Sequence, residues 1–158
     1  MIRDILKDDM RDVVQDDFEE IFKISSDFVD ENFVEKTGKL QLDRCKEVYD
    51  SLIKNEEAYK RVYVKNNIIQ TFLIMSPHYT LFNFDKRAIS GGWVTNTKLT
   101  KLARIKACIY ILEDMFNWAE KSEIKHLDLN MTHESPSILK ILDNLGFVLI
   151  DKIYTTEV

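Results

Sequence analysis

Two adjacent asparagines, Asn66 and Asn67, separate two strand-like segments in the middle of the chain. Residues 59–64 alternate in the manner of a half-exposed strand, and residues 68–75 form a mostly apolar run that ends at Ser76-Pro77. Asparagine tolerates the positive φ angles that a tight hairpin turn requires. The pattern therefore predicts an antiparallel hairpin at the centre of the fold.

Further strands and helices are predicted before and just after this hairpin. Strands at 80–84 and 88–95, joined by residues 85–87, extend the hairpin into a meander. Apolar residues spaced three and four apart predict helices in the N-terminal part. The N-terminal elements expected are a short strand at 2–6, a helix at 10–22 capped by Asp9, a second helix that carries Phe28, Val29 and Phe33 and stops near Gly38, and a third helix at 42–54.

The C-terminal part is predicted to alternate between helices and strands. Its elements are a long helix at 105–121, a strand at 126–131, a helix from Ser135-Pro136 to Gly146, and a strand at 147–150 that continues toward Thr155. Serine before proline is typical of a helix start, and glycine is typical of a helix end. The order of all these elements predicts an α+β fold.

Length and composition indicate one folded domain. The chain has 158 residues and no linker or low-complexity segment, so we expect a single domain at 1–158. It has no apolar stretch long enough for a membrane span, and charges in the first ten residues exclude a secretory signal, so we expect a cytoplasmic protein. Cys45 and Cys108 match no metal-ligand spacing and are expected to be reduced thiols.

Charge is distributed unevenly along a chain whose net charge is −5. Residues 4–20 carry eight acids and two bases, which we interpret as the exposed face of a helix. Residues 85–106 carry six bases and one acid, and four of the bases lie where a strand gives way to a helix. Helix N-termini bind anions, so this stretch suits a polyanionic ligand. Nucleic acid is the weaker candidate, because the whole chain is acidic and Trp93 is the only aromatic residue in the stretch.

The sequence contains none of the conventional catalytic motifs. Its four glycines form no nucleotide-binding loop, and neither His-Glu-x-x-His nor Gly-x-Ser-x-Gly occurs. His133-Glu134, beside Ser135, could act as a base with an orienting carboxylate, although a polar turn is also expected before a helix. Asn130, at a strand end, is a candidate binding residue. The three histidines have no paired spacing, so no metal site is expected.

Four segments between Gly91 and Phe147 share their order and character with motifs of a known enzyme family. They are Trp93-Val94-Thr95-Asn96, the basic stretch 98–106 with the long helix after it, Leu127-Asp128-Leu129-Asn130, and Leu145-Gly146-Phe147 after an apolar helix. Together they resemble the second half of the Gcn5-related N-acetyltransferases, the GNAT family. The resemblance implies a mixed, mostly antiparallel sheet of six to seven strands, flanked by four to five helices, with a cleft between the strand ending near Asn96 and the strand at 127–130.

The resemblance also implies that the protein binds acetyl-CoA and transfers its acetyl group to an amine. In the GNAT family an Arg/Gln-x-x-Gly-x-Gly/Ala loop and a helix N-terminus hold the pyrophosphate. Two registers match that loop here without a glycine, one beginning at Arg104 and one at Lys98. The cofactor-binding residues implied are Val94, Thr95, Arg104, Ile105, Lys106, Ala107, Asn130 and Ser135, and the catalytic residues implied are His133 and Glu134.

Two catalytic features of the family are missing from this sequence. Leu142 stands where the family often has a tyrosine that protonates the departing CoA thiolate. Residues 90–93 offer no carboxylate as acid or base. The sequence thus supplies the binding half of the site more clearly than the chemical half, and acyl-CoA binding without turnover remains an alternative.

A narrower resemblance offers a second alternative. Trp93-Val94-Thr95 before a basic helix, followed by a Thr/Ser-rich turn and Ile-Leu-x-x-Leu-Gly-Phe at 141–147, is similar to the internal virion protein A-like group of short-tailed bacteriophages. This resemblance implies a catalytically inactive structural or assembly protein of a phage virion. Such a protein would act in the host cytoplasm or the virion, with protein partners in place of acetyl-CoA.

Overall fold

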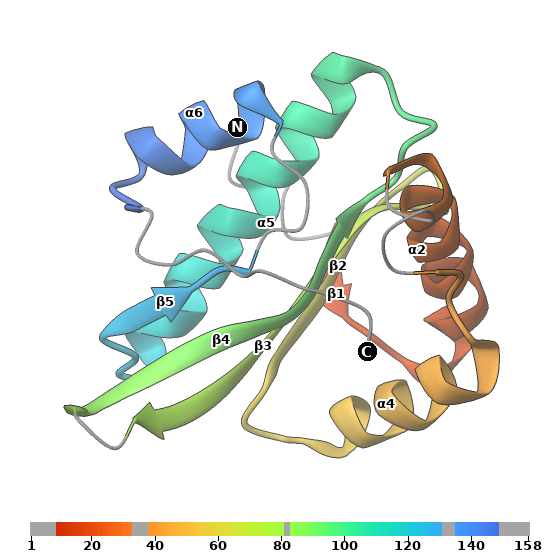
Figure 1. Ribbon diagram of the computed structural model, residues 1–158. Helices are drawn as coiled ribbons and strands as arrows, with labels where there is room; N and C mark the ends of the chain where they lie inside the picture. The colour runs from red at the N-terminus through yellow and green to blue at the C-terminus, as the bar shows by residue number, and fades with distance from the viewer. Residues whose placement is uncertain (1–8, 33–37, 81–82, 131–134, 149–158) are drawn as a thin grey trace.

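The computed structural model describes residues 9–32, 38–80, 83–130 and 135–148, and a five-stranded sheet forms its centre (Figure 1). The strands lie side by side in chain order: β1 Met10–Asp12, β2 Tyr59–Lys65, β3 Ile68–Thr80, β4 Asn83–Thr95 and β5 His126–Asp128. Neighbours run antiparallel from β1 to β4, whereas β5 runs parallel to β4. The expected mixed, mostly antiparallel sheet is therefore confirmed.

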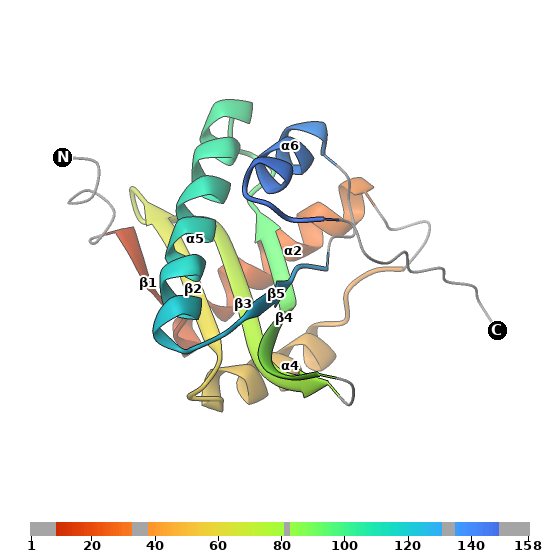
Figure 2. The ribbon, with the colours of Figure 1, turned by 90° about the vertical axis from the view of Figure 1, so that its left-hand side faces the viewer.

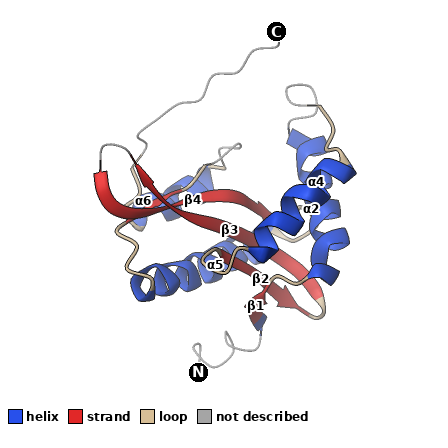
Figure 3. Cartoon of the chain, turned by 90° about the horizontal axis from the view of Figure 1, so that it is seen from below, coloured by secondary structure: helices blue, strands red, loops and turns tan. Residues whose placement is uncertain are grey.

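Helices cover both faces of this sheet (Figure 2, Figure 3). One face carries α2 Phe18–Asn32, preceded by the 3-10 turn η1 Gln15–Asp17, together with α4 Leu42–Lys54. The other face carries α5 Lys101–Lys121 and α6 Pro136–Asn144. The described residues thus hold five strands and four α-helices, fewer strands than the six to seven expected.

Alternate residues of β3 contribute side chains to two separate apolar cores. Leu73 and Met75 pack in a cluster with Ile111 of α5, while Phe72 packs in a second cluster with Phe18 of α2. Successive side chains of a strand point to opposite faces, so one strand contributes to both cores. Burial on both faces explains why residues 68–75 read as a mostly apolar run.

The central hairpin follows the sequence prediction. Asn66 and Asn67 have φ angles of 53° and 58°, so both occupy the left-handed region of a tight two-residue turn. Strand pairing continues on each side, with Lys65 opposite Ile68 and Tyr59 opposite Met75. The helices predicted at 42–54, at 105–121 and from Ser135 to Gly146 are also confirmed.

The prediction of a helix starting after Asp9 is wrong. Residues 10–12 form β1, which pairs with β2 through Met10 opposite Tyr63. The carboxylate of Asp17 accepts hydrogen bonds from the amide of Val14 at 2.8 Å and from Arg11 at 2.7 and 2.6 Å. These bonds place the helical start after Val14, and α2 then continues through both predicted N-terminal helices. The strand predicted at 2–6 and Phe33 lie outside the described residues.

Two long strands, β3 and β4, replace the three strands predicted at 68–75, 80–84 and 88–95, so the separate strand at 80–84 is wrong. Pro77 does not end β3 but pairs with Ala88, and residues 85–87 lie inside β4 instead of forming a turn. Strand β2 begins at Tyr59, opposite Met75, and does not reach Pro77. The missing N–H of Pro77 therefore costs no hydrogen bond to β2. At the C-terminal end, Phe147 and Val148 are not in a strand, and the remainder of the predicted last strand lies outside the described residues. None of the described helices is long and apolar enough to cross a membrane.

Candidate functional site

The sheet divides between β4 and β5, where the sequence predicted a cleft. The two strands pair only from Arg87 opposite His126 to Ile89 opposite Asp128. Arg87 fixes this short ladder through a two-pronged ion pair with Asp128, at 3.0 Å from Nε and 2.7 Å from Nη2. Beyond it, the amide of Asn130 donates to the side-chain oxygen of Ser90 at 2.7 Å, and β4 continues without β5 to Thr95.

A β-bulge lies in β4 where the two strands begin to separate. Ile74 pairs with Gly92 and Met75 pairs with Ser90, so Gly91 has no opposite residue on β3. Gly91 and its neighbour Gly92 thus lie at the irregularity in the ladder. A Cβ atom at Gly91 or Gly92 would lie 3.9 or 3.6 Å from the nearest side chain, which is ordinary contact. The bulge bends β4, and a bend at this position favours its divergence from β5.

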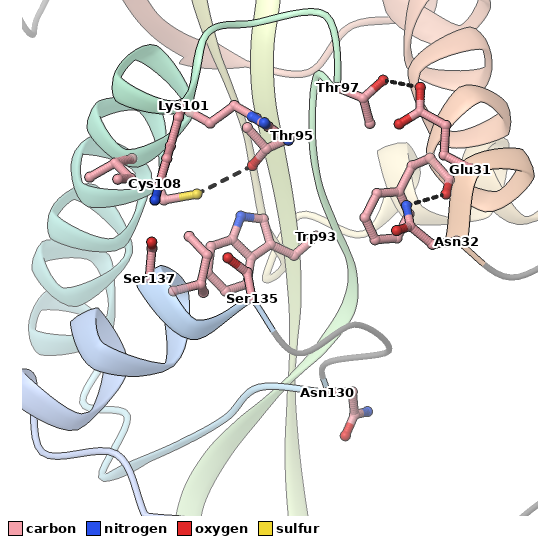
Figure 4. A pocket seen from close by; sticks show the side chains of 14 residues that line it. Glu31, Asn32, Trp93, Thr95, Thr97, Lys101, Cys108, Asn130, Ser135 and Ser137 are labelled. Atoms are coloured by element: carbon pink, nitrogen blue, oxygen red, sulfur yellow. Dashed lines mark hydrogen bonds between the residues drawn. The ribbon is translucent and has the colours of Figure 1, made fainter.

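A cavity of about 270 Å³ lies beside the free end of β4 (Figure 4). Its walls come from the C-terminal end of α2, the last residues of β4, the first two turns of α5 and the start of α6. Ile105 and Ile138 make part of the wall apolar. Lys101 and Arg104 add positive charge from α5. The cavity therefore combines an apolar surface with a basic helix start.

The first turn of α5 shows which amides are available to an anion. Thr100 caps the helix, and its Oγ1 accepts a hydrogen bond from the amide of Ala103 at 3.3 Å. The amide of Arg104 donates to the carbonyl of Thr100 at 3.0 Å. The helix-start amides that precede these two have no helical acceptor. Of the two loop registers, the one at 98–103 therefore contains the helix start, while residues 104–107 lie within the helix.

The loop between β4 and α5 is shaped by side-chain hydrogen bonds instead of glycine. Asn96 Oδ1 accepts from the amide of Lys98 at 3.0 Å, and Asn96 Nδ2 donates to the carbonyl of Ile69 at 3.2 Å. Thr97 donates to Glu31 at 3.0 Å, and Lys98 Nζ lies 3.1 Å from Asp27 Oδ2. These contacts attach the loop both to the sheet and to α2.

Most of the predicted cofactor residues meet at this cavity. Thr95, Arg104, Ile105, Asn130 and Ser135 all line it. Three others do not, because Val94 packs against the core on the α2 side of the sheet, Lys106 is exposed, and Ala107 is fully buried in the α5 core. The predicted catalytic pair, His133 and Glu134, lies outside the described residues.

A buried polar chain forms another part of the wall. Cys108 Sγ lies 3.3 Å from Thr95 Oγ1, which lies 3.0 Å from Thr71 Oγ1. Burial raises the pKa of the Cys108 thiol, and its hydrogen bond with Thr95 offsets only part of that effect. Cys108 is therefore a neutral thiol at neutral pH and is unsuited to act as a nucleophile.

Sequence reasoning missed several cavity residues. Trp93, Cys108, Glu31 and Ser137 line the cavity but were not proposed as site residues. The period of a strand could have indicated Trp93, because it shares a face with Thr95 and not with Val94. The position of Glu31 depends on how α2 packs across the sheet, which no local pattern reports.

Comparison with solved structures identifies the fold. A possible acetyltransferase from Clostridium difficile has a TM-score of 0.68 at 16% identity, covering 94% of this chain and 96% of its own. A GNAT family acetyltransferase from Staphylococcus aureus has a TM-score of 0.63 at 13% identity, covering 94% and 97%. An aminoglycoside 6′-N-acetyltransferase from Acinetobacter haemolyticus has a TM-score of 0.67 at 9% identity, covering 94% and 96%.

Sequence comparison adds no relative to these structures. No family model matches the chain, and no curated protein matches it by sequence. The low identities show a common fold and no more. The strand order, the division between β4 and β5 and these similar structures together show that the chain has the GNAT acetyltransferase fold.

Proposed function

We propose that this protein binds acetyl-CoA in the cavity beside β4 and transfers the acetyl group to an amine. The observation that carries the proposal is the position of this cavity, which lies where β4 and β5 separate and is lined by Lys101 and Arg104 at the start of α5. The similar structures named above are described as acetyltransferases, one of them for aminoglycoside antibiotics. Their fold supports the same ligand for this chain.

The lining residues suit the chemical parts of such a ligand. The free amides of the α5 start, with Lys101 and Arg104, offer positive charge and hydrogen bonds to a pyrophosphate. Ile105 and Ile138 offer apolar contact to the pantetheine arm, while the side chain of Asn130 offers a hydrogen-bonding group. Bound acetyl-CoA would supply an activated acyl group.

The chain offers several groups that could move protons in this reaction. Glu31 has an exposed carboxylate at the cavity that accepts a hydrogen bond from Thr97, and it is able to take a proton from an amine. His133 and Glu134, acting through a water molecule, remain the bases proposed from the sequence. The hydroxyls of Ser135 and Ser137 line the cavity and are able to donate hydrogen bonds to a group that gains negative charge.

Charge reversal within α5 tests the binding half of the proposal. Arg104→Glu replaces a cavity cation by an anion, so we expect acetyl-CoA affinity in isothermal titration calorimetry to fall by at least tenfold. Lys106→Glu is the matched control, because Lys106 is exposed, lies outside the lining and changes charge by the same amount. We expect the control to bind nearly as wild type does. Absence of heat from wild-type protein at millimolar acetyl-CoA would contradict the proposed function.

A second candidate function is acyl-CoA binding without turnover. Leu142, at the position of the family tyrosine, is buried in the core with Ile111 and Leu112 and has no proton to donate. Release of free CoA thiol in the presence of amines distinguishes the two candidates, since a binding protein without turnover releases none. The third idea, a structural role in a phage virion, gains no support from the similar structures named above and stays a prediction from the sequence.

A further inference from the structure

The indole N–H of Trp93 is a buried hydrogen-bond donor without an acceptor. Trp93 lies on β4 and its side chain lines the cavity, yet Nε1 has no hydrogen-bond partner among the described residues. Figure 4 shows the ring in the middle of the lining, between side chains of α5 and α6 and those of α2. Buried polar groups are nearly always paired in folded proteins, so this donor requires an explanation.

Neighbouring groups in the lining are already bonded to one another. Thr95 Oγ1 and Cys108 Sγ form a pair at 3.3 Å, and Thr95 also contacts Thr71. The carbonyl of Val94 accepts the hydrogen bond of Thr71 at 2.9 Å. These groups therefore already have hydrogen-bond partners, and the indole N–H has no acceptor among the described residues.

The chemistry of the donor restricts its partner. An indole N–H donates one hydrogen bond and accepts none, so its partner must carry an acceptor atom, which a protonated amine lacks. Ile105 and Ile138 in the same wall favour an apolar chain near that acceptor. A carbonyl oxygen carried on a flexible, largely apolar arm has both properties.

We propose that Trp93 binds the acyl-pantetheine arm of acetyl-CoA by donating a hydrogen bond from Nε1 to a carbonyl oxygen of that arm. The inference rests on the proposed function and assigns one contact within it. The Nε1 atom itself is buried, whereas the side chain as a whole is only half-buried. The proposed contact therefore requires the indole to turn toward the cavity as the arm enters, and the carbonyl then supplies the acceptor that the described residues do not provide.

Calorimetry with two ligands tests the contact. Trp93→Phe retains an aromatic ring and removes the donor, so we expect acetyl-CoA affinity to fall by about tenfold. Trp118→Phe is the matched control, because Trp118 packs on Tyr59 with ring centroids 5.3 Å apart and does not line the cavity. A loss for acetyl-CoA alone assigns the thioester carbonyl, and an equal loss for CoA assigns a pantetheine amide carbonyl. Unchanged affinity for both ligands would overturn the proposal.

Nuclear magnetic resonance separates a hydrogen bond from a loss of packing. The chain has two tryptophans, so protein labelled with ¹⁵N shows two indole N–H signals, and Trp93→Phe identifies which one belongs to Trp93. We expect saturating acetyl-CoA to move the Trp93 proton signal downfield while the Trp118 signal stays in place. A Trp93 signal that does not move although the calorimeter records binding would overturn this inference and leave the proposed function intact. If neither acetyl-CoA nor CoA binds, both this inference and the proposed function are contradicted.

Discussion

At the scale of single residues, Asp17 has the most defined structural role. Asp17 is buried just before α2, and its carboxylate accepts hydrogen bonds from Nη1 and Nη2 of Arg11 and from the amide of Val14. Burial alone would raise the pKa of Asp17, but the hydrogen bonds from Arg11 and Val14 outweigh burial, and the pKa lies below its ordinary value of 3.8. Asp17 therefore stabilises the fold in its charged form.

Asp17→Asn should lower the free energy of unfolding at pH 7 by roughly 1–2 kcal/mol, because it weakens charge-assisted hydrogen bonds whose Arg11 partner is partly exposed to solvent. A carboxyl with a depressed pKa contributes its stability above its ordinary pKa and loses it as pH falls through the folded value. The difference from wild type in urea unfolding should therefore shrink below pH 4. Asp16→Asn, at an exposed neighbouring position, is the control, and an equal effect at both positions would contradict this role.

At the scale of elements, the pairing of β4 with β5 depends on very few contacts. The parallel ladder covers three residue pairs, and two side-chain contacts support it: His126 Nε2 lies 3.5 Å from Asp85 Oδ2, and Arg87 forms its ion pair with Asp128. Both partners are about four-fifths buried, with exposed fractions of 18% and 22%. This short contact sets where the sheet divides and hence where the cavity begins.

Removing that support should loosen β5 before it unfolds the protein. In Arg87→Ala we expect faster hydrogen exchange at the amide of Asn130, which donates to Ser90, and weaker acetyl-CoA binding. Amides in β2 should exchange as in wild type. Arg44→Ala removes an ion pair between side chains that are 78% and 72% exposed, and it serves as the control. Unchanged exchange at Asn130 would show that the ion pair does not hold the strand.

Elements defined by neighbouring residues were predictable, and those defined by distant contacts were not. The turn at Asn66-Asn67 and the start of α6 at Ser135-Pro136 depend on local backbone preferences that the sequence displays. The strand β1 depends on pairing with β2 across about fifty residues, and the continuation of β3 through Pro77 depends on β2 beginning opposite Met75. Neither contact is visible in the neighbouring sequence. Residues 10–12 were therefore predicted to be helical, and the strand was predicted to end at Ser76-Pro77.

At the scale of the whole molecule, a single sheet joins the two apolar cores and the cavity. Both cores draw side chains from β3, and the core on the α5 side lies next to the cavity through Trp93 and Ile138, which pack against that core and line the cavity. Disruption of one core should therefore unfold the other as well, because both cores depend on the same strand β3 staying in place. The part of the candidate site that α5 and α6 supply was predictable from the sequence. The part that α2 supplies was not, because it depends on how α2 packs across the sheet.

Ile111→Ala should lower the free energy of unfolding by about 2–5 kcal/mol, because Ile111 is fully buried in the α5 core. We expect one transition in denaturant, with coincident curves from tryptophan fluorescence, which reports the α5 face, and from circular dichroism. Leu102→Ala on the same helix, where the side chain is 63% exposed, should change stability by less than about 0.5 kcal/mol. Two separated transitions would show that the cores unfold independently.

The loop after β4 also determines which substitutions this chain tolerates. A glycine-rich loop depends on the absence of side chains, and it fails when one is added. Here the shape depends on Asn96, which is buried, donates to Ile69 and accepts from the amide of Lys98. In this chain a substitution therefore disturbs the loop by removing a side chain that makes two hydrogen bonds, and not by adding one where none fits.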